Sequence, residues 1–248
     1  MIDPLLILIA AVFLVAGFVK GVVGLGLPTV SMGLLALNMA PSRAIAIVIV
    51  PAIVTNIWQT FVGPHLRDIL KRLWPLMIGT VIGCWLNAGA LTGPYARYGT
   101  VVLGILLVIY AIIGLSKFKF HVAPQNEKWV GGVVGVVTGV ISASTGVQVI
   151  PSMPFMQAIG MEKDELVQAL GVFFTTATLA LAFNLTAGGL LTPANAVPGA
   201  VAMAFAGMFV GQLVRAKMPA EAFRRWFLIA MILLGVYLAG SAAAKQFA

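Results

Sequence analysis

Long apolar runs separated by short polar corners fill this chain from end to end. Several runs reach the roughly 20 residues that an α-helix needs to span a bilayer. No run alternates polar and apolar residues at every second position, as the strands of a membrane β-barrel would. The pattern therefore predicts an all-α polytopic membrane protein.

One stretch, residues 20–39, departs from an uninterrupted helix and organises the rest of the chain. It reads KGVVGLGLPTVSMGLLALNM, with three glycines and a proline crowded together after a lysine. A glycine in a helix interior costs roughly 1 kcal/mol against alanine, and a proline roughly 3 kcal/mol. Because a break within lipid leaves backbone groups unpaired, it must face protein or a watery cavity.

A second stretch of this design lies 122 residues further on, where Gly146 corresponds to Gly24. It covers residues 142–161 and reads SASTGVQVIPSMPFMQAIGM. Both stretches have an apolar arm, a small or polar break, a second arm and a polar corner. Interrupted apolar segments at corresponding positions of two halves indicate the binding site of a transporter.

The remaining segments repeat in the same order. The pattern predicts arms over residues 5–19 and 29–37, then helices over 44–62, 73–91 and 99–115. It next predicts arms over 129–141 and 147–159, then helices over 166–187, 194–214 and 223–243. The predicted organisation is a first transmembrane repeat at 1–115, a cytoplasmic linker at 116–128 and a second transmembrane repeat at 129–248.

Loop charges predict the orientation of these segments. The basic connectors, residues 65–72, 116–128 and 215–225, are expected in the cytoplasm. The uncharged connector 188–195 and the short turn near 92–97 are expected outside, as are both termini. The third segment then ends inside in one half and outside in the other. We therefore expect two inverted-topology repeats, each a broken-helix hairpin plus three transmembrane helices.

Composition agrees with this class of protein. Hydrophobic residues make up 61% of the 248 residues and charged residues 9%, whereas soluble domains carry roughly 25% charged residues. The net charge of +8 comes mostly from basic residues that flank apolar segments, so it indicates membrane orientation and no nucleic-acid partner. The single cysteine, Cys84, excludes an intrachain disulfide and a thiolate metal cluster.

Three runs resemble the TauE/SafE family of sulfite and organosulfonate exporters: the break GVVGLGLPTVSMGLLAL, the corner NMAPSRAIA and the second-half run GVISASTGVQVIPSMPFMQAIGM. The resemblance covers nearly the whole chain, including residues 75–83 and 198–207. It implies a secondary transporter that exports sulfite or an organosulfonate from a bacterial cell, as a multi-pass protein of the inner membrane. The alternative is an importer, or a carrier of another small organic anion such as a carboxylate.

An anion that crosses lipid needs positive potential and hydrogen-bond donors. Helix N-termini supply both, and the second arms are expected to begin at the breaks, near Thr29 and Val147. Hydroxyl and amide donors suit sulfonate oxygens. The expected substrate-binding residues are Lys20, Gly24, Gly26, Thr29, Asn56, Ser142, Ser144, Thr145, Gly146 and Gln148. Close helix packing is the alternative role of the small residues.

Lys20 carries the sharpest of these hypotheses, because a lysine within a membrane segment usually marks a functional site. Its alternative is to snorkel to the interface from the end of an arm about 22 Å long if helical. A similar choice concerns six polar residues of the two third segments, which either line a path or bond helix to helix. They are Asn56, Gln59, Thr60, Thr175, Thr176 and Thr178.

The sequence lacks the residues that a primary pump, a metal site or an intramembrane enzyme would need. All seven acidic residues fall at ends or connectors: Asp3, Asp68, Glu127, Glu162, Asp164, Glu165 and Glu221. No Walker-type phosphate-binding motif for primary pumping occurs, nor a metal cluster or catalytic constellation. We expect no metal, no cofactor and no enzymatic activity. The expected partners are a small anion and the lipid bilayer. The sequence is also compatible with a homo-oligomer.

Overall fold

The computed structural model describes residues 3–91, 98–116, 121–161, 163–192, 197–215, 217 and 220–247. Their secondary structure is helical, which confirms the all-α class. The helices are α1 (Pro4–Val23), α2 (Leu27–Leu35), α3 (Pro41–Phe61), α4 (Leu66–Leu86), α5 (Gly99–Leu115), the short 3-10 helix η2 (Pro124–Asn126), α6 (Glu127–Thr145), α7 (Ser152–Ala158), α8 (Lys163–Ala187), α9 (Pro198–Arg215) and α10 (Ala220–Phe247). The predicted turn at 92–97, Glu162, and parts of the predicted connectors (117–120, 193–196, 216 and 218–219) lie outside the described residues.

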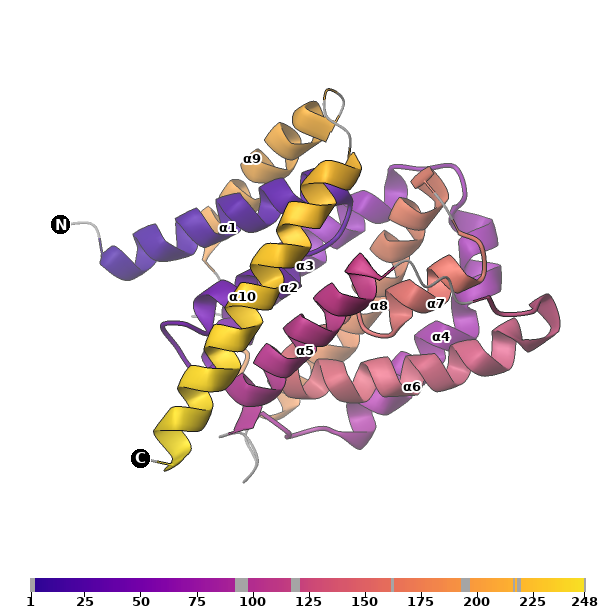
Figure 1. Cartoon of the computed structure of the whole chain (residues 1–248). Coiled ribbons are helices and arrows are strands. Elements are labelled where there is room, and N and C mark those ends of the chain that lie inside the picture. The colour runs from indigo at the N-terminus through magenta and orange to yellow at the C-terminus, as the bar shows by residue number, and fades with distance from the viewer. Residues whose placement is uncertain are drawn as a thin grey trace. The chain divides into compact units, whose positions relative to one another are not determined.

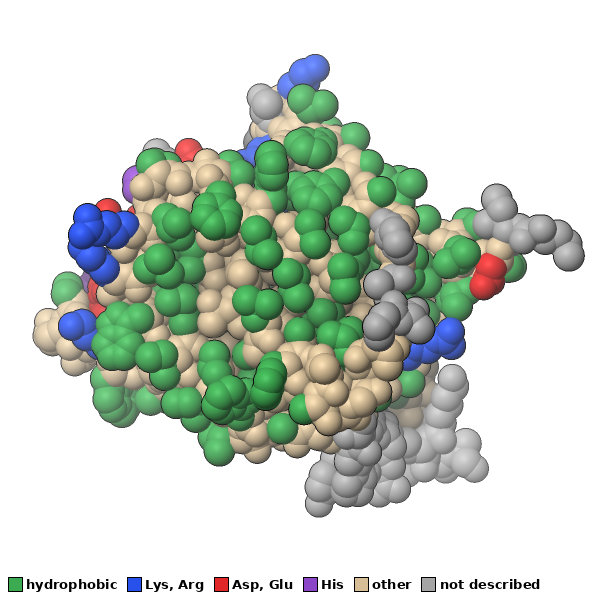
Figure 2. All heavy atoms as spheres, turned by 180° about the vertical axis from the view of Figure 1, so that it is seen from behind, with side chains coloured by type: hydrophobic (Ala, Val, Ile, Leu, Met, Phe, Trp, Pro, Cys, Tyr) green, Lys and Arg blue, Asp and Glu red, His purple; other side chains and the backbone are tan. Residues whose placement is uncertain are grey.

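Six helices in these described ranges are long and apolar enough to cross a membrane, judged by length and composition. The spans lie in α1, α3, α4, α6, α8 and α10, and the apolar helices α5 and α9 are shorter. Large apolar side chains point outward along them, and Figure 2 shows hydrophobic side chains over much of the face that it draws. Such a surface suits contact with lipid.

Two compact units divide the chain, and neither coincides with one half of the sequence. Unit 1 consists of Met1–Pro51, Arg97–Ser116 and Thr192–Ala248, and unit 2 of Ala52–Ala96 and Lys117–Leu191. The boundary between the units falls inside α3, after Pro51. Each unit therefore draws helices from both halves of the sequence.

Close backbone packing holds the helices of unit 1 together. There α1 lies alongside α9, and α5 alongside α10 (Figure 1). A Cβ atom on Gly17 of α1 would overlap the backbone of Ala204, and one on Gly207 of α9 would overlap the backbone of Leu14. Small residues thus let α1 and α9 approach closely, as is common in membrane helix pairs.

Unit 2 uses the same device in its own main helix pair, α4 and α6 (Figure 1). A Cβ on Gly83 of α4 would overlap the backbone of Val136, and one on Gly135 of α6 would overlap that of Leu76. In both units the first arm of one sequence half packs against the fourth helical segment of the other half, counting the short second arm. Glycines therefore serve helix packing in both pairs.

Several predicted boundaries are wrong: α1 continues to Val23, past the predicted end at residue 19, and α4 ends at Leu86, before the predicted end at residue 91. Residues 66–72, predicted as a connector, form the first turns of α4. The apolar residues of this stretch recur at helical spacing, and Ile69 and Leu73 are buried on one face. The second arm of the second half begins at Ser152, five residues later than the predicted start at Val147. The prediction for α5, by contrast, matches its bounds.

Candidate functional site

The first break lies between α1 and α2 in unit 1. Gly24 caps the C-terminus of α1 with a φ of 84° and donates its N–H to the carbonyl of Lys20 over 2.7 Å. Gly26, with a φ of 108°, caps the N-terminus of α2. Glycine adopts these left-handed conformations at little cost, unlike other residues. The break is therefore a helix end followed almost directly by a helix start.

Lys20 lies in the last turn of α1 and not in the break itself, where the sequence analysis placed it. Its exposed fraction is only 3%. A snorkelling lysine keeps its ammonium in water or among lipid headgroups, so this degree of enclosure disfavours the snorkelling alternative. The adjacent Gly21 packs against the backbone of Met208 in α9. An amine-bearing side chain is thus enclosed within protein beside the break.

The start of α2 brings backbone donors and polar side chains together. Gly26 makes no side-chain cap, so the first N–H groups of α2 depend on other acceptors. Thr29 is 3% exposed, and Ser31 is fully buried. The Ser31 hydroxyl has no hydrogen-bond partner in the described part of the chain. Buried polar groups without a partner are rare and require an explanation.

The second break lies in unit 2, after α6. Gly146 caps α6 with a φ of 72° and donates its N–H to the carbonyl of Ser142 over 2.8 Å, which is the geometry found at Gly24. The hydroxyl of Thr145 donates to the carbonyl of Ile141 (2.8 Å) and accepts from the N–H of Val147 (3.2 Å). The chain then continues without helix until α7 begins, so the predicted helix N-terminus at Val147 is not formed.

The two serines that precede this break have different surroundings. Ser142 is fully buried, and its hydroxyl has no partner among the described residues. Ser144 accepts from the amide nitrogen of Asn87 (2.6 Å) and donates to the carbonyl of Val140 (3.2 Å). Its hydroxyl therefore ties α6 to the residue that ends α4. Of the two predicted serines, Ser142 is the one with hydrogen-bonding capacity left over.

A hydrogen-bonded chain joins two further predicted site residues in unit 2. The amide nitrogen of Asn56 donates to the hydroxyl of Thr178 (3.5 Å). That hydroxyl donates to Oε1 of Gln148 (3.1 Å), in the non-helical segment after Gly146. The exposed fractions of Asn56, Thr178 and Gln148 are 0%, 1% and 3%. The structure thus connects Asn56 to the second break through Thr178.

Other polar residues of α3 and α8 bond helix to helix. Nε2 of Gln59 donates to the carbonyl of Val167 (2.6 Å), and Nε2 of Gln168 donates to the carbonyl of Thr60 (2.9 Å). These reciprocal bonds use donors that would otherwise be buried without partners. For the Gln59 side chain the packing alternative is therefore supported.

Hydrogen bonds between the side chains of α3 and α8 show the relative direction of these two helices. The Thr60 hydroxyl bonds to that of Thr175 (3.2 Å), and Asn56 bonds to Thr178. The residue number falls along α3 as it rises along α8, so this part of α3 runs antiparallel to α8.

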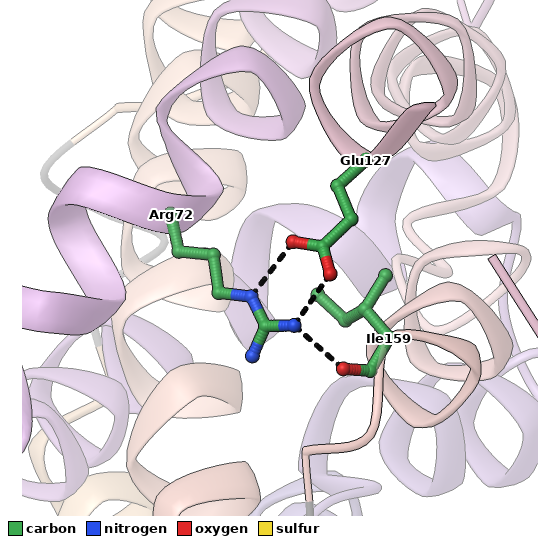
Figure 3. Close-up of polar contacts among 3 residues, drawn as sticks. All are labelled: Arg72, Glu127 and Ile159. Carbon is green, nitrogen blue, oxygen red and sulfur yellow. Dashed lines mark hydrogen bonds and ion pairs between the residues drawn. The ribbon is translucent and has the colours of Figure 1, made fainter. Parts of the chain in front are cut away.

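Arg72 links the C-terminal end of the short helix α7 to α4 and α6. Arg72 of α4 donates from Nε and Nη2 to the two carboxylate oxygens of Glu127 at the start of α6 (2.8 and 2.6 Å) (Figure 3). The same Nη2 donates to the carbonyl of Ile159, the C-cap of α7 (2.6 Å). A paired, forked guanidinium contact of this kind fixes geometry as well as charge. The sequence placed Arg72 in a connector and gave no sign of this pairing.

Comparison with known proteins decides the family. A model of the family described as Sulfite exporter TauE/SafE matches residues 9–238. The chain belongs to this family. The resemblance noted in the sequence is thereby confirmed, and the chain is a multi-pass membrane transporter and not an enzyme. No curated protein and no solved structure matches the chain.

The residues predicted for the TauE/SafE site divide between the two units. Unit 1 holds Lys20, Gly24, Gly26 and Thr29, and unit 2 holds Asn56, Ser142, Ser144, Thr145, Gly146 and Gln148. Ser31 and Thr178 were not among the substrate-binding residues predicted from the sequence. Thr178 follows Asn56 by the 122 residues that separate the two breaks, a signal that could have included it. Within the described residues no group of three or more His, Cys, Asp or Glu could hold a metal ion.

Proposed function

We propose that this TauE/SafE transporter exports a small sulfur-containing anion, sulfite or an organosulfonate, across the bacterial inner membrane. The observation that carries the proposal is the enclosure of Lys20 beside a break from which a new helix starts. A cationic lysine and the partial positive charge of a helix N-terminus both favour an anion. A negative cell interior drives anion export by about 2.3 kcal/mol per charge per 100 mV, so export needs no coupling cation.

The polar residues of the second break support an anion with several oxygens. Ser142 and Gln148 are buried and neutral, and each can donate hydrogen bonds. Sulfite and sulfonate oxygens accept such bonds. None of the residues that we assign to the second break is acidic.

We propose further that the two sequence halves are inverted-topology repeats. The equal caps at Gly24 and Gly146 support equivalent positions in the two halves. The antiparallel course of α3 and α8 supports the inversion, because these helices occupy the same place in their halves. Asn56 and Thr178, which bond to each other, are separated by the same 122 residues as the two breaks.

Flux through purified protein in proteoliposomes tests the transport proposal. Radiolabelled sulfite and methanesulfonate are loaded inside, a potassium gradient with valinomycin sets the potential, and radiolabelled acetate serves as the carboxylate for comparison. We expect efflux of both sulfur anions to accelerate when the interior is negative. Transport of acetate with exclusion of both sulfur anions would instead identify a carboxylate carrier.

Cysteine labelling tests the inversion in a Cys84→Ser background. His65 follows α3 and Ala187 ends α8, and both are exposed. We expect a cysteine at position 65 to react with a membrane-impermeant maleimide from the cytoplasmic side, and one at position 187 from the outer side. Labelling of both cysteines from the same side would contradict inverted repeats.

A further inference from the structure

We propose that Thr178 is a positioning residue, which holds the side-chain amide of Gln148 so that both its N–H donors face the transported anion. The proposal rests on the proposed function and assigns Gln148 the role of oxyanion donor. A hydroxyl carries one proton. Because Asn56 donates to the Thr178 hydroxyl, that proton is available for Oε1 of Gln148. The carbonyl end of the amide is thereby held, and its nitrogen makes no hydrogen bond within the described part of the chain.

Thr178 uses its hydroxyl unlike most threonines of this protein. A threonine in a helix commonly donates to the carbonyl four residues earlier. Such bonds are formed by Thr60, Thr80, Thr138, Thr145, Thr175, Thr176 and Thr186. Thr178 forms no such bond and instead donates to Gln148, which lies outside any helix. The hydroxyl thus orients a side chain of the break and leaves its own helix backbone unmodified.

A second observation at the same break points to a ligand with oxygen acceptors. The Ser142 hydroxyl is fully buried without a partner, four residues before Gly146. Gln148 follows Gly146 by two residues, and its carbonyl oxygen is already bonded. The fully buried Ser142 hydroxyl and the amide nitrogen of Gln148, a residue 3% exposed, therefore both have donor capacity left over. A sulfite or sulfonate group, with three oxygens around one sulfur, would accept from both.

The experiment compares three variants in sulfite and methanesulfonate export from proteoliposomes. Thr178→Val keeps the shape of the side chain and removes the hydroxyl, and Thr178→Ser restores the hydroxyl. Thr175→Val is the matched control, because Thr175 lies one turn away on α8 and bonds Thr60. We expect Thr178→Val to raise KM roughly three- to tenfold with the maximal rate largely retained. Thr178→Ser and Thr175→Val should keep the parental KM.

The possible results separate the two proposals. Wild-type protein that exports neither anion would overturn the proposed function. Active wild-type protein in which Thr178→Val and Thr175→Val have the same KM would overturn the positioning role alone. If Thr178→Val cannot be recovered folded, Gln148→Met decides, since it keeps the side-chain length and removes both donors. It should abolish the thermal stabilisation that sulfite gives in detergent, and unchanged stabilisation would refute the role of Gln148.

Discussion

The break of unit 1 ends its first helix at Gly24 and the break of unit 2 at Gly146, each with a left-handed glycine that donates to the carbonyl four residues earlier. That carbonyl belongs to Lys20 in unit 1 and to Ser142 in unit 2. After the cap, unit 1 starts the nine-residue α2 almost at once, whereas unit 2 continues without helix to the seven-residue α7. The same left-handed glycine cap therefore lies beside a lysine in unit 1 and beside neutral hydrogen-bond donors in unit 2.

The two breaks should therefore interact with an anion in different ways. A buried lysine and a helix N-terminus attract any anion, because their field depends on charge more than on shape. Oriented amide and hydroxyl donors distinguish anions by the positions of their oxygens, because an unmatched buried donor is costly. We therefore expect substitutions in the break of unit 1 to change the affinity for all anions alike, and substitutions in the break of unit 2 to change the affinity for one anion relative to another.

The largest expected effect comes from disrupting the feature that both breaks share. Gly24→Leu and Gly146→Leu each force a residue with a Cβ into the left-handed region, at about 1–2 kcal/mol. We expect each to abolish sulfite flux, because the cap directs the chain into the polar segment that follows. Flux in proteoliposomes measures the effect, and thermal unfolding in detergent verifies that the protein remains folded.

Asparagine is the matched control at both positions, since it tolerates the left-handed conformation better than other residues with a side chain. Gly24→Asn and Gly146→Asn should retain most of the flux. Loss of flux from one leucine variant and not the other would show that the breaks are unequal in function. Normal flux through both leucine variants would make the breaks packing features alone.

The two breaks were predictable from sequence, because Gly24 and Gly146 lie in interrupted apolar runs and recur at one offset of 122 residues. The structures that follow the two breaks, a helix in unit 1 and a non-helical segment in unit 2, were not predictable. Residues 147–151 lie outside any helix, and Gln148 among them accepts from Thr178, which is distant in sequence. Arg72 likewise read as a connector residue, since its partners Glu127 and Ile159 come from the other half of the sequence.

The second largest effect should follow removal of the amine that distinguishes unit 1. Lys20→Met is expected to weaken sulfite binding about tenfold or more, the range of a charge-assisted hydrogen bond. Lys20→Arg should retain part of the affinity, because the charge survives while its geometry changes. Competition with radiolabelled sulfite measures both. In Lys20→Met the affinity for the dianion sulfite should fall more than the affinity for the monoanion methanesulfonate. Unchanged affinity for both anions would leave the N-terminus of α2 as the source of positive potential.

A smaller effect is expected from releasing the short second arm of unit 2. Arg72→Gln removes the bonds to both Glu127 and Ile159, whereas Glu127→Gln leaves the bond to the Ile159 carbonyl. The Arg72 side chain is 34% exposed, so solvent screening limits the ion pair to about 1 kcal/mol. Arg72→Gln should therefore lower the thermal midpoint more and speed hydrogen exchange at the end of α7. Equal effects of the two variants would show that the Ile159 bond contributes nothing.

The smallest effects on stability should come from Ser31→Ala and Ser142→Ala, one in each unit. Both hydroxyls are buried without a partner in the described part of the chain, so their removal should leave the free energy of unfolding unchanged or raise it by up to about 1 kcal/mol. Ser152→Ala is the matched control, because the Ser152 hydroxyl donates to the carbonyl of Gln148 over 2.6 Å. That variant should lose about 1 kcal/mol.

Ligand measurements on the same variants then compare the two units directly. We expect Ser142→Ala to change the ratio of sulfite to methanesulfonate affinity, because it removes a donor that we propose for one oxygen of the anion. Ser31→Ala should weaken the binding of both anions by a similar, smaller factor, since Lys20 and the start of α2 still attract an anion. A change of the ratio in Ser31→Ala and not in Ser142→Ala would reverse the assignment and place the selective donors in unit 1.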